Sequence, residues 1–592
     1  MNDMSNLPTW DLTDLFAGPE DLEIETQLQA LEKSVNAFQN KFQGQVAGLS
    51  GADLHGALLD YEAAQDRLGR LMAFAFLYYA GDMADPERGR FMQVMQERVN
   101  GITGKSLFFS IEINRLDENA MAAKYEGSAE LRRYRPWLDD IRAMRPYMLS
   151  DDAEQLLHDK SVTGAAAWIR LFDDTMARLK FDLDGEQLPS QVAFDRLTSA
   201  DETVRKKAAD AINETLSANI HTFALITNTL AKDRDIENSW RKLETPEQSR
   251  HILNQVEPEV VGALKEAVVG NYAQLSHRYY ALKARWMGKD VLEHWDRNAP
   301  LPDTGGRRYS WSDAETMVLD AYQRFSPQLA DVGRQFFRNA WIDAGPRAGK
   351  SPGAFAHPTV PSAHPYLLLN FQGRVRDVMT LAHELGHGVH QVLAGDQGAL
   401  LCNTPLTLAE TASVFGEMLT FRSLLSGVEN PAQRRTMIAG KVEDMLNTVV
   451  RQTAFYEFEL RLHRARQQGE LTADAIGDIW MAVQSESLGP AIRLGDDYRS
   501  YWSYIPHFIH SPFYVYAYAF GDCLVNALYS VYEQAPDGFQ DKYLDLLRAG
   551  GTKRHQELLA PFGLDASDPA FWNRGLGVIS GFIDELEQLE GQ

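Results

Sequence analysis

The stretch that decides the fold lies at residues 381–390, which read Leu-Ala-His-Glu-Leu-Gly-His-Gly-Val-His. Apolar side chains recur around it at helical spacing, so we expect a helix with one buried stripe. His383 and His387 are four residues apart and would project from one face of that helix. Two imidazoles at this spacing can hold one divalent ion, and Glu384 can take a proton from its bound water. Burying these three side chains without a partner would be costly, which favours a metal site over an apolar helix with incidental polar residues.

Carboxylates downstream of His387 are the candidates for a third ligand, because catalytic zinc usually has three protein ligands and an open position for water. Asp396 follows Gly395, where the helix should end, and we expect it to point away from the histidines. His390 lies one turn beyond His387, and we expect it to pack or hydrogen-bond behind the site rather than bind metal.

A second helix should follow and carry two glutamates. The Thr-Pro pair at 404–405 is typical of an N-cap and first turn, so we expect a helix from about 405 to 425. We predict Glu410 as the third ligand of one zinc ion per chain, and Glu417, two turns on, as an outer partner that orients an imidazole. The alternative is a pair of solvated surface glutamates, which the apolar neighbours of both residues disfavour.

The composition indicates a large globular protein. Of its 592 residues 44% are hydrophobic and 24% charged, and a net charge of −24 disfavours nucleic acid and anionic membranes as partners. The two cysteines, Cys402 and Cys523, exclude a disulfide framework and fit a reducing compartment. We see no signal peptide, and the longest apolar run is too short to span a bilayer. We therefore expect a cytoplasmic protein; the sequence leaves its oligomeric state open.

The rest of the chain reads as mostly α-helical. Long amphipathic segments fill the N-terminal part, at 20–45, 51–81, 86–125, 128–148 and 151–178. Alternating residues around 177–190 with Asp-Gly predict a hairpin and a boundary, giving an N-terminal helical domain over 1–190 and a catalytic domain over 191–592. Capping boxes at 199–202 and 312–315 should open further helices. Residues 366–371 should form a strand of a small sheet near the active site, and its edge could bind an extended peptide.

Several motifs resemble the oligoendopeptidase F branch of the thimet oligopeptidase family. They are 365–371 (PYLLLNF), 383–390 (HELGHGVH), 410–417 (ETASVFGE), 502–508 (WSYIPHF) and 512–518 (PFYVYAY). The resemblance implies a mostly α-helical fold around a deep substrate channel, covered by the N-terminal helices. It also implies zinc on the two histidines and the glutamate predicted above, with Glu384 as base and short unstructured oligopeptides as substrates.

The C-terminal motifs supply candidates for stabilising an oxyanion, which needs donors such as Tyr or His. His507 and Tyr518 match the family's histidine and tyrosine best. Further candidates for substrate contact are Tyr514, Tyr516, His510 and Asn370. The alternative for the three tyrosines is an alternating strand or an aromatic core.

We therefore predict a zinc metallo-endopeptidase of oligopeptides. One alternative keeps this chemistry but trims C-termini as a carboxypeptidase, with Arg493 or Arg499 holding the terminal carboxylate. The other is a helical peptide-binding protein with a structural metal. Three ligands and an adjacent glutamate speak against it, because structural zinc sites normally have four protein ligands.

Overall fold

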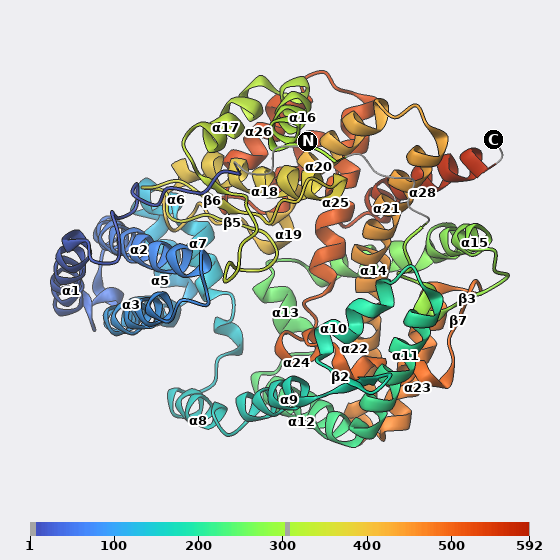
Figure 1. Cartoon of the computed structure of the whole chain (residues 1–592). Helices are drawn as coiled ribbons and strands as arrows, with labels where there is room; N and C mark the ends of the chain where they lie inside the picture. The colour runs from blue at the N-terminus through green and yellow to red at the C-terminus, as the bar shows by residue number, and fades with distance from the viewer. Residues whose placement is uncertain (1–6, 302–307, 591–592) are drawn as a thin grey trace. The chain divides into compact units, whose positions relative to one another are not determined.

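The computed structural model describes residues 7–301 and 308–590, which form many helices and a few short strands (Figure 1). This confirms the predicted mostly α-helical fold class. Two compact units are each assembled from three stretches of chain. Unit 1 comprises Met1–Arg145, Gly306–Gly427 and Val531–Leu564; unit 2 comprises Pro146–Gly305, Val428–Ser530 and Asp565–Gln592. The division into functional domains at residue 190 stays a prediction.

Unit 1 begins with helices that carry none of the predicted metal ligands. They are α1 (Leu22–Phe42), α2 (Gly51–Ala80), α3 (Pro86–Gly104), α4 (Leu107–Arg115), α5 (Glu118–Glu126), α6 (Ala129–Arg133) and α7 (Arg135–Arg142). All of them except α3 contribute to one buried aromatic and aliphatic cluster, which includes Phe38, Leu58 and Phe109. The single helix predicted over 86–125 is wrong: the chain forms three. Asp117 starts the last of them, because its side chain accepts the Ala120 N–H.

The remainder of unit 1 carries the predicted metal site. Its elements are α16 (Trp311–Phe325), α17 (Pro327–Arg338), β4 (Ile342–Asp343), β5 (Phe355–His357), β6 (Tyr366–Leu368), α18 (Val375–Ala394), α19 (Leu406–Ala409), α20 (Thr411–Ser426), α26 (Phe539–Arg548) and α27 (His555–Leu559). The capping box of α16 is Ser310–Asp313 rather than the predicted 312–315, because the Ser310 side chain accepts the Asp313 N–H.

The small sheet of unit 1 corrects one expectation. The predicted strand forms as β6, but it lies between β4, which pairs with it in parallel, and β5, which pairs with it antiparallel. Both sides of β6 are therefore hydrogen-bonded, and it offers no free edge to a peptide. The edge on the α18 side belongs to β5, and β5 contacts α18.

Unit 2 is also helical. Its elements are α8 (Asp151–Ser161), α9 (Ala165–Arg178), β1 (Phe181–Leu183), β2 (Glu186–Leu188), α10 (Ser190–Asp195), α11 (Glu202–Ala218), α12 (Ile220–Arg241), α13 (Gln248–Leu253), α14 (Pro258–Gly270), α15 (Ser276–Trp286), β3 (Leu292–Glu293), α21 (Pro431–Thr448), α22 (Val450–Gln468), α23 (Ala473–Leu488), β7 (Ile492–Arg493), α24 (His507–His510), most of α25 (Tyr516–Gln534) and α28 (Pro569–Glu590). The predicted hairpin is confirmed as β1–β2, with Asp184 and Gly185 at positive φ in its turn. Asp201, not Ser199, caps α11.

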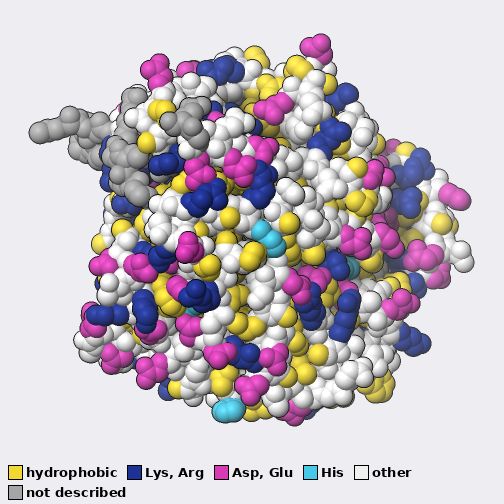
Figure 2. Space-filling view, turned by 90° about the vertical axis from the view of Figure 1, so that its right-hand side faces the viewer, with side chains coloured by type: hydrophobic (Ala, Val, Ile, Leu, Met, Phe, Trp, Pro, Cys, Tyr) yellow, Lys and Arg dark blue, Asp and Glu magenta, His cyan; other side chains and the backbone are white. Residues whose placement is uncertain are grey.

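Charged side chains of both signs are mixed on the visible surface. Acidic and basic side chains are interspersed across the face shown in Figure 2, with scattered hydrophobic ones between them. No described helix combines the length and the apolarity that crossing a membrane requires.

Candidate metal centre

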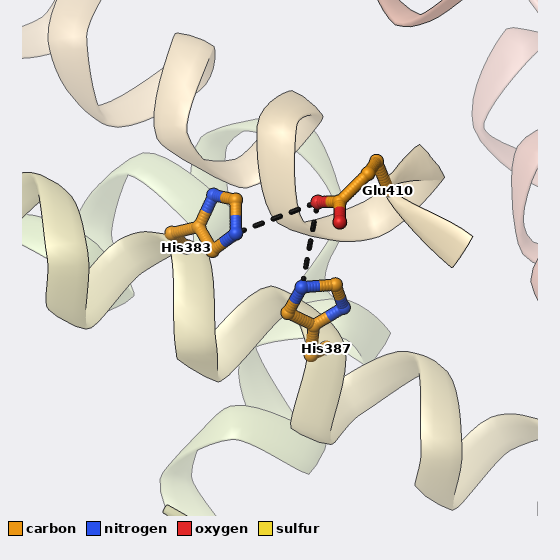
Figure 3. A group of neighbouring side chains, drawn as sticks. All are labelled: His383, His387 and Glu410. Atoms are coloured by element: carbon orange, nitrogen blue, oxygen red, sulfur yellow. Dashed lines mark ion pairs between the residues drawn. The ribbon is translucent and has the colours of Figure 1, made fainter. Parts of the chain in front are cut away.

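His383, His387 and Glu410 converge in unit 1 as predicted (Figure 3). Both histidine Nε2 atoms lie 3.4 Å from Glu410 Oε2. Zinc bonds of about 2.0–2.1 Å in a tetrahedral site hold ligand atoms about 3.4 Å apart, so these residues fit a zinc ion. Within the described part of the chain, this is the one group of three such residues close enough to share a metal.

The close approach of α18 and α20 explains how Glu410 reaches the histidines. Gly386, between the two histidines, faces α20 so closely that a Cβ there would lie 2.4 Å from the carbonyl oxygen of Ala412. The helix predicted from 405 to 425 is interrupted at Glu410, whose backbone (φ −80°, ψ 0°) separates α19 from α20. Ser413 Oγ then donates a hydrogen bond to Glu410 Oε2 at 2.7 Å. The break and this bond orient the carboxylate.

The three predicted ligands are partly exposed and electrostatically coupled. Burial raises the pKa of the Glu410 carboxyl, but the hydrogen bond and charge of His387 outweigh it and lower that pKa to about 2. Burial likewise disfavours the charged form of His383, yet Glu417 and Glu410 together raise its pKa to about 9. Neighbouring carboxylates thus favour positive charge at His383, and a divalent cation would satisfy the same preference.

Glu384 and Glu417 take different places around this group. Glu384 is 7% exposed, and its pKa is raised mainly by burial. The backbone N–H of Ala356 in β5 favours the charged carboxylate and partly offsets this rise in pKa. Glu417 Oε2 lies 3.3 Å from His383 Nδ1, on the ring edge opposite Glu410. The contact with β5 was missed in the sequence, because residues 355–357 lie in a Gly/Pro-rich stretch with weak strand character.

A cavity of about 790 Å³ adjoins the metal group within unit 1, lined among others by His387, Gln391 and Trp341. Among the lining residues that the structure describes, none is Lys or Arg. Asp396 lies on its wall in the turn after α18, exposed and outside the metal group. His390 is buried behind the site, where its Nε2 lies 3.2 Å from Thr404 Oγ1; burial lowers its pKa to about 4.

The predicted oxyanion residues lie in unit 2. His507 Nε2 is 3.3 Å from Tyr518 Oη, and the rings of Tyr514 and Tyr518 meet edge to face with centroids 5.3 Å apart. All three are half-buried. Tyr516 differs: it is 1% exposed, and its hydroxyl accepts a hydrogen bond from Asn254.

Two further residues predicted to contact substrate, His510 and Asn370, contact other parts of the protein. His510 is exposed and its Nε2 lies 2.8 Å from Asp173 Oδ1. Asn370, in unit 1, donates its amide hydrogens to the carbonyl oxygens of Ser351 and Gly353 and so anchors the loop before β5. Their contact with substrate stays a prediction.

Comparison with known proteins identifies the family. The model of peptidase family M3 matches residues 197–578, and the model named Oligopeptidase F matches residues 112–181. The chain belongs to peptidase family M3. It is therefore a metalloendopeptidase by family, as the resemblance of its motifs predicted.

Similar proteins cover nearly the whole chain. Oligopeptidase PepF of Bacillus subtilis is 27% identical, over 98% of this chain and 87% of its own length. The plasmid oligoendopeptidase F of Lactococcus lactis is 23% identical, over 99% and 98%. A crystal structure from Chlamydophila abortus has a TM-score of 0.86 at 22% identity, covering 98% of both chains. Oligoendopeptidase-F of Enterococcus faecium has a TM-score of 0.72 at 20% identity, covering 96% of this chain and 99% of that one.

Proposed function

We propose that this M3 peptidase is a zinc-dependent endopeptidase that hydrolyses short, unstructured oligopeptides. The observation that carries the proposal is the approach of His383 and His387 to within 3.4 Å of Glu410, with Glu384 on the same helix. A bound zinc would supply a Lewis acid for the scissile carbonyl and lower the pKa of a water. Three protein ligands leave the open position that this chemistry needs.

Glu384 is the general base. Its carboxylate accepts a proton from the attacking water and passes it to the leaving amine. Burial raises its pKa, which makes it a better proton acceptor than an exposed glutamate. The Ala356 N–H favours the charged form of the same carboxylate. Glu417 accepts from His383 Nδ1–H and so keeps Nε2 free for the metal.

His507 and Tyr518 donate hydrogen bonds to the oxyanion that develops during attack. Burial lowers the pKa of His507, so its ring is neutral at pH 7 and donates from one nitrogen only. The 3.3 Å contact of its Nε2 with Tyr518 Oη keeps the two side chains together, and it must open before both can donate to the oxyanion.

An extended peptide would lie along β5 rather than β6. The backbone of Ala356 faces α18: its N–H stabilises the charged form of Glu384, and its carbonyl oxygen lies 3.5 Å from Gln391 Nε2. A substrate strand added at this edge would take over these backbone groups and run past the proposed base. The cavity beside His387 then has room for a substrate side chain.

Endopeptidase action is favoured over carboxypeptidase action. A carboxypeptidase needs a cation for the terminal carboxylate, but Arg493 pairs with Glu293 and Arg499 with Asp478. The cavity wall also lacks Lys and Arg among its described residues.

Cys402 and Cys523 are both free thiols, which supports the proposed cytoplasmic location.

Mass spectrometry of a mixed peptide pool tests the proposal. The chain should cut internal bonds of peptides of about 5 to 20 residues, a reach of roughly 3.4 Å per residue. A chelator should stop the cleavage and added zinc should restore it. Release of only C-terminal residues would favour the carboxypeptidase, and cleavage that survives metal removal would refute the zinc mechanism. A folded protein that contains the same peptide should stay intact, because unfolding it locally costs several kcal/mol.

A further inference from the structure

The turn between α24 and α25 contains an unusual backbone conformation. Phe513 has φ +62°, in the left-handed region that bulky side chains rarely adopt. The residue is fully buried, and its ring centroid lies 4.7 Å from that of His463. A strained backbone conformation of this kind persists only where several surrounding contacts hold it in place.

A buried carboxylate holds this residue. Glu459 on α22 is 2% exposed, and its Oε1 accepts the Phe513 N–H at 2.8 Å. Its Oε2 has no hydrogen-bond partner among the residues described. The proposed reaction does not use Glu459, so its burial requires another explanation.

Cations from two other helices surround the same turn. Arg250 on α13 donates from Nε to the Pro512 carbonyl oxygen at 3.2 Å, and its guanidinium lies 5.8 Å from the Tyr514 ring centroid. Arg234 on α12 lies 5.9 Å from the Phe513 ring centroid. Three helices therefore hold the turn by its backbone and its rings.

The turn lies between the proposed oxyanion residues. His507 begins α24, Tyr514 directly follows Phe513, and Tyr518 lies in the first turn of α25. The rings of His507 and Tyr514 are stacked at 6.4 Å, and Tyr514 in turn meets Tyr518. Any rotation of the backbone at Phe513 would move these rings relative to one another.

We propose that Glu459 is a positioning residue: by accepting the Phe513 N–H it fixes the left-handed turn that sets Tyr514 and Tyr518 against His507. The inference rests on the proposed roles of His507 and Tyr518. Burial raises the pKa of Glu459 to about 8, against the opposing effects of the Phe513 hydrogen bond and of Arg234 and Arg250. The nearby His463 is neutral, because burial lowers its pKa to about 3. Oε1 accepts in either protonation state, so the function requires an acceptor and not a charge.

The test compares variants that keep or remove the hydrogen-bond acceptor at position 459. Glu459→Gln keeps a carbonyl oxygen for the Phe513 N–H, whereas Glu459→Ala removes it. Glu457→Ala is the matched control, because Glu457 lies on the same helix but pairs with Lys265 and Arg461 instead of the turn. For each chain, kcat and KM on one peptide and the melting temperature are measured. Hydrogen exchange of the segment 511–518 is followed by mass spectrometry.

Glu459→Ala should lower kcat by about 10- to 100-fold with little change in KM, because misplaced donors act on the transition state. In Glu459→Ala, the amide hydrogen of Phe513 should exchange with solvent at least about 10-fold faster than in wild type. Glu459→Gln and Glu457→Ala should keep kcat within about threefold of wild type. If Glu459→Gln loses as much kcat and protection as Glu459→Ala, or Glu457→Ala does, the inference is wrong. A wild-type chain that cleaves no peptide would refute the proposed function, while the exchange rates would still decide whether Glu459 holds the turn.

Discussion

Removing the carboxylate of Glu417 should weaken zinc binding without removing a ligand. Its Oε2 lies 3.3 Å from His383 Nδ1, and this contact fixes the ring so that Nε2 faces Glu410. Loss of such an outer partner typically weakens metal affinity 10- to 100-fold. That range corresponds to about 1.4–2.7 kcal/mol of zinc binding free energy. Glu417→Gln should lose less than Glu417→Ala, because its amide oxygen can still accept from Nδ1–H.

Competition with a chelator of known affinity, followed by metal analysis, measures this effect. Glu410→Ala should retain no stoichiometric zinc, because it removes one of three ligands. Asp396→Ala is the control and should bind zinc like wild type, since Asp396 is exposed and outside the metal group. Wild-type zinc affinity in Glu417→Ala, or zinc loss in Asp396→Ala, would refute the assignment of ligands and outer partner.

Three further predictions concern other parts of the chain. Tyr518→Phe and His507→Ala should each lower kcat about 10²–10³-fold with a smaller effect on KM; a loss of folding alone, seen by circular dichroism, would make them core residues instead. Gly386→Ala should lower the free energy of unfolding by about 1–3 kcal/mol and release zinc, because its Cβ would lie 2.4 Å from a carbonyl oxygen of α20, whereas Gly395→Ala, with open space around its Cβ, should not. Burial of His251 lowers its pKa from 6.5 to about 4. Between these pH values the unfolded chain binds a proton at this residue and the folded chain does not, so the free energy of unfolding should fall by up to about 3 kcal/mol from pH 6.5 to 4. Denaturation across this pH range measures the fall, which should be smaller in His251→Gln.

The metal helix was predictable because its features are local. The apolar stripe of α18 and the spacing of His383 and His387 are fixed by helix geometry, and α18 ends at Ala394, directly before Gly395 as expected. The convergence of Glu410 was also predicted, but its backbone was not: the chain forms a break there, where a continuous helix was expected. That break depends on the close approach of α18 and α20, which involves residues far apart in sequence.

Features that depend on long-range pairing could not be predicted. Residues 366–368 do form a strand, but only the pairing with β4 and β5 makes it the central one, and those partners have two or three residues each. The hydrogen bond from the Phe513 N–H to Glu459 joins positions 54 residues apart. Phe513 belongs to the motif at 512–518, but Glu459 lies in none of the motifs, so the sequence does not predict this contact. Tyr516 and Tyr518 are two residues apart and look equivalent in sequence, yet one is buried and the other half-exposed because both lie on a helix.

The most direct test of the zinc mechanism is the activity of Glu384→Gln in a metal-replete chain. Zinc content is measured by mass spectrometry of the intact holoprotein, and peptide hydrolysis is followed in the same sample. Because Glu384 accepts a proton and is not a ligand, the variant should hold about one zinc per chain and hydrolyse no peptide above background. Substantial hydrolysis by the zinc-loaded variant would contradict Glu384 as the base, and loss of zinc would contradict its place outside the ligand set.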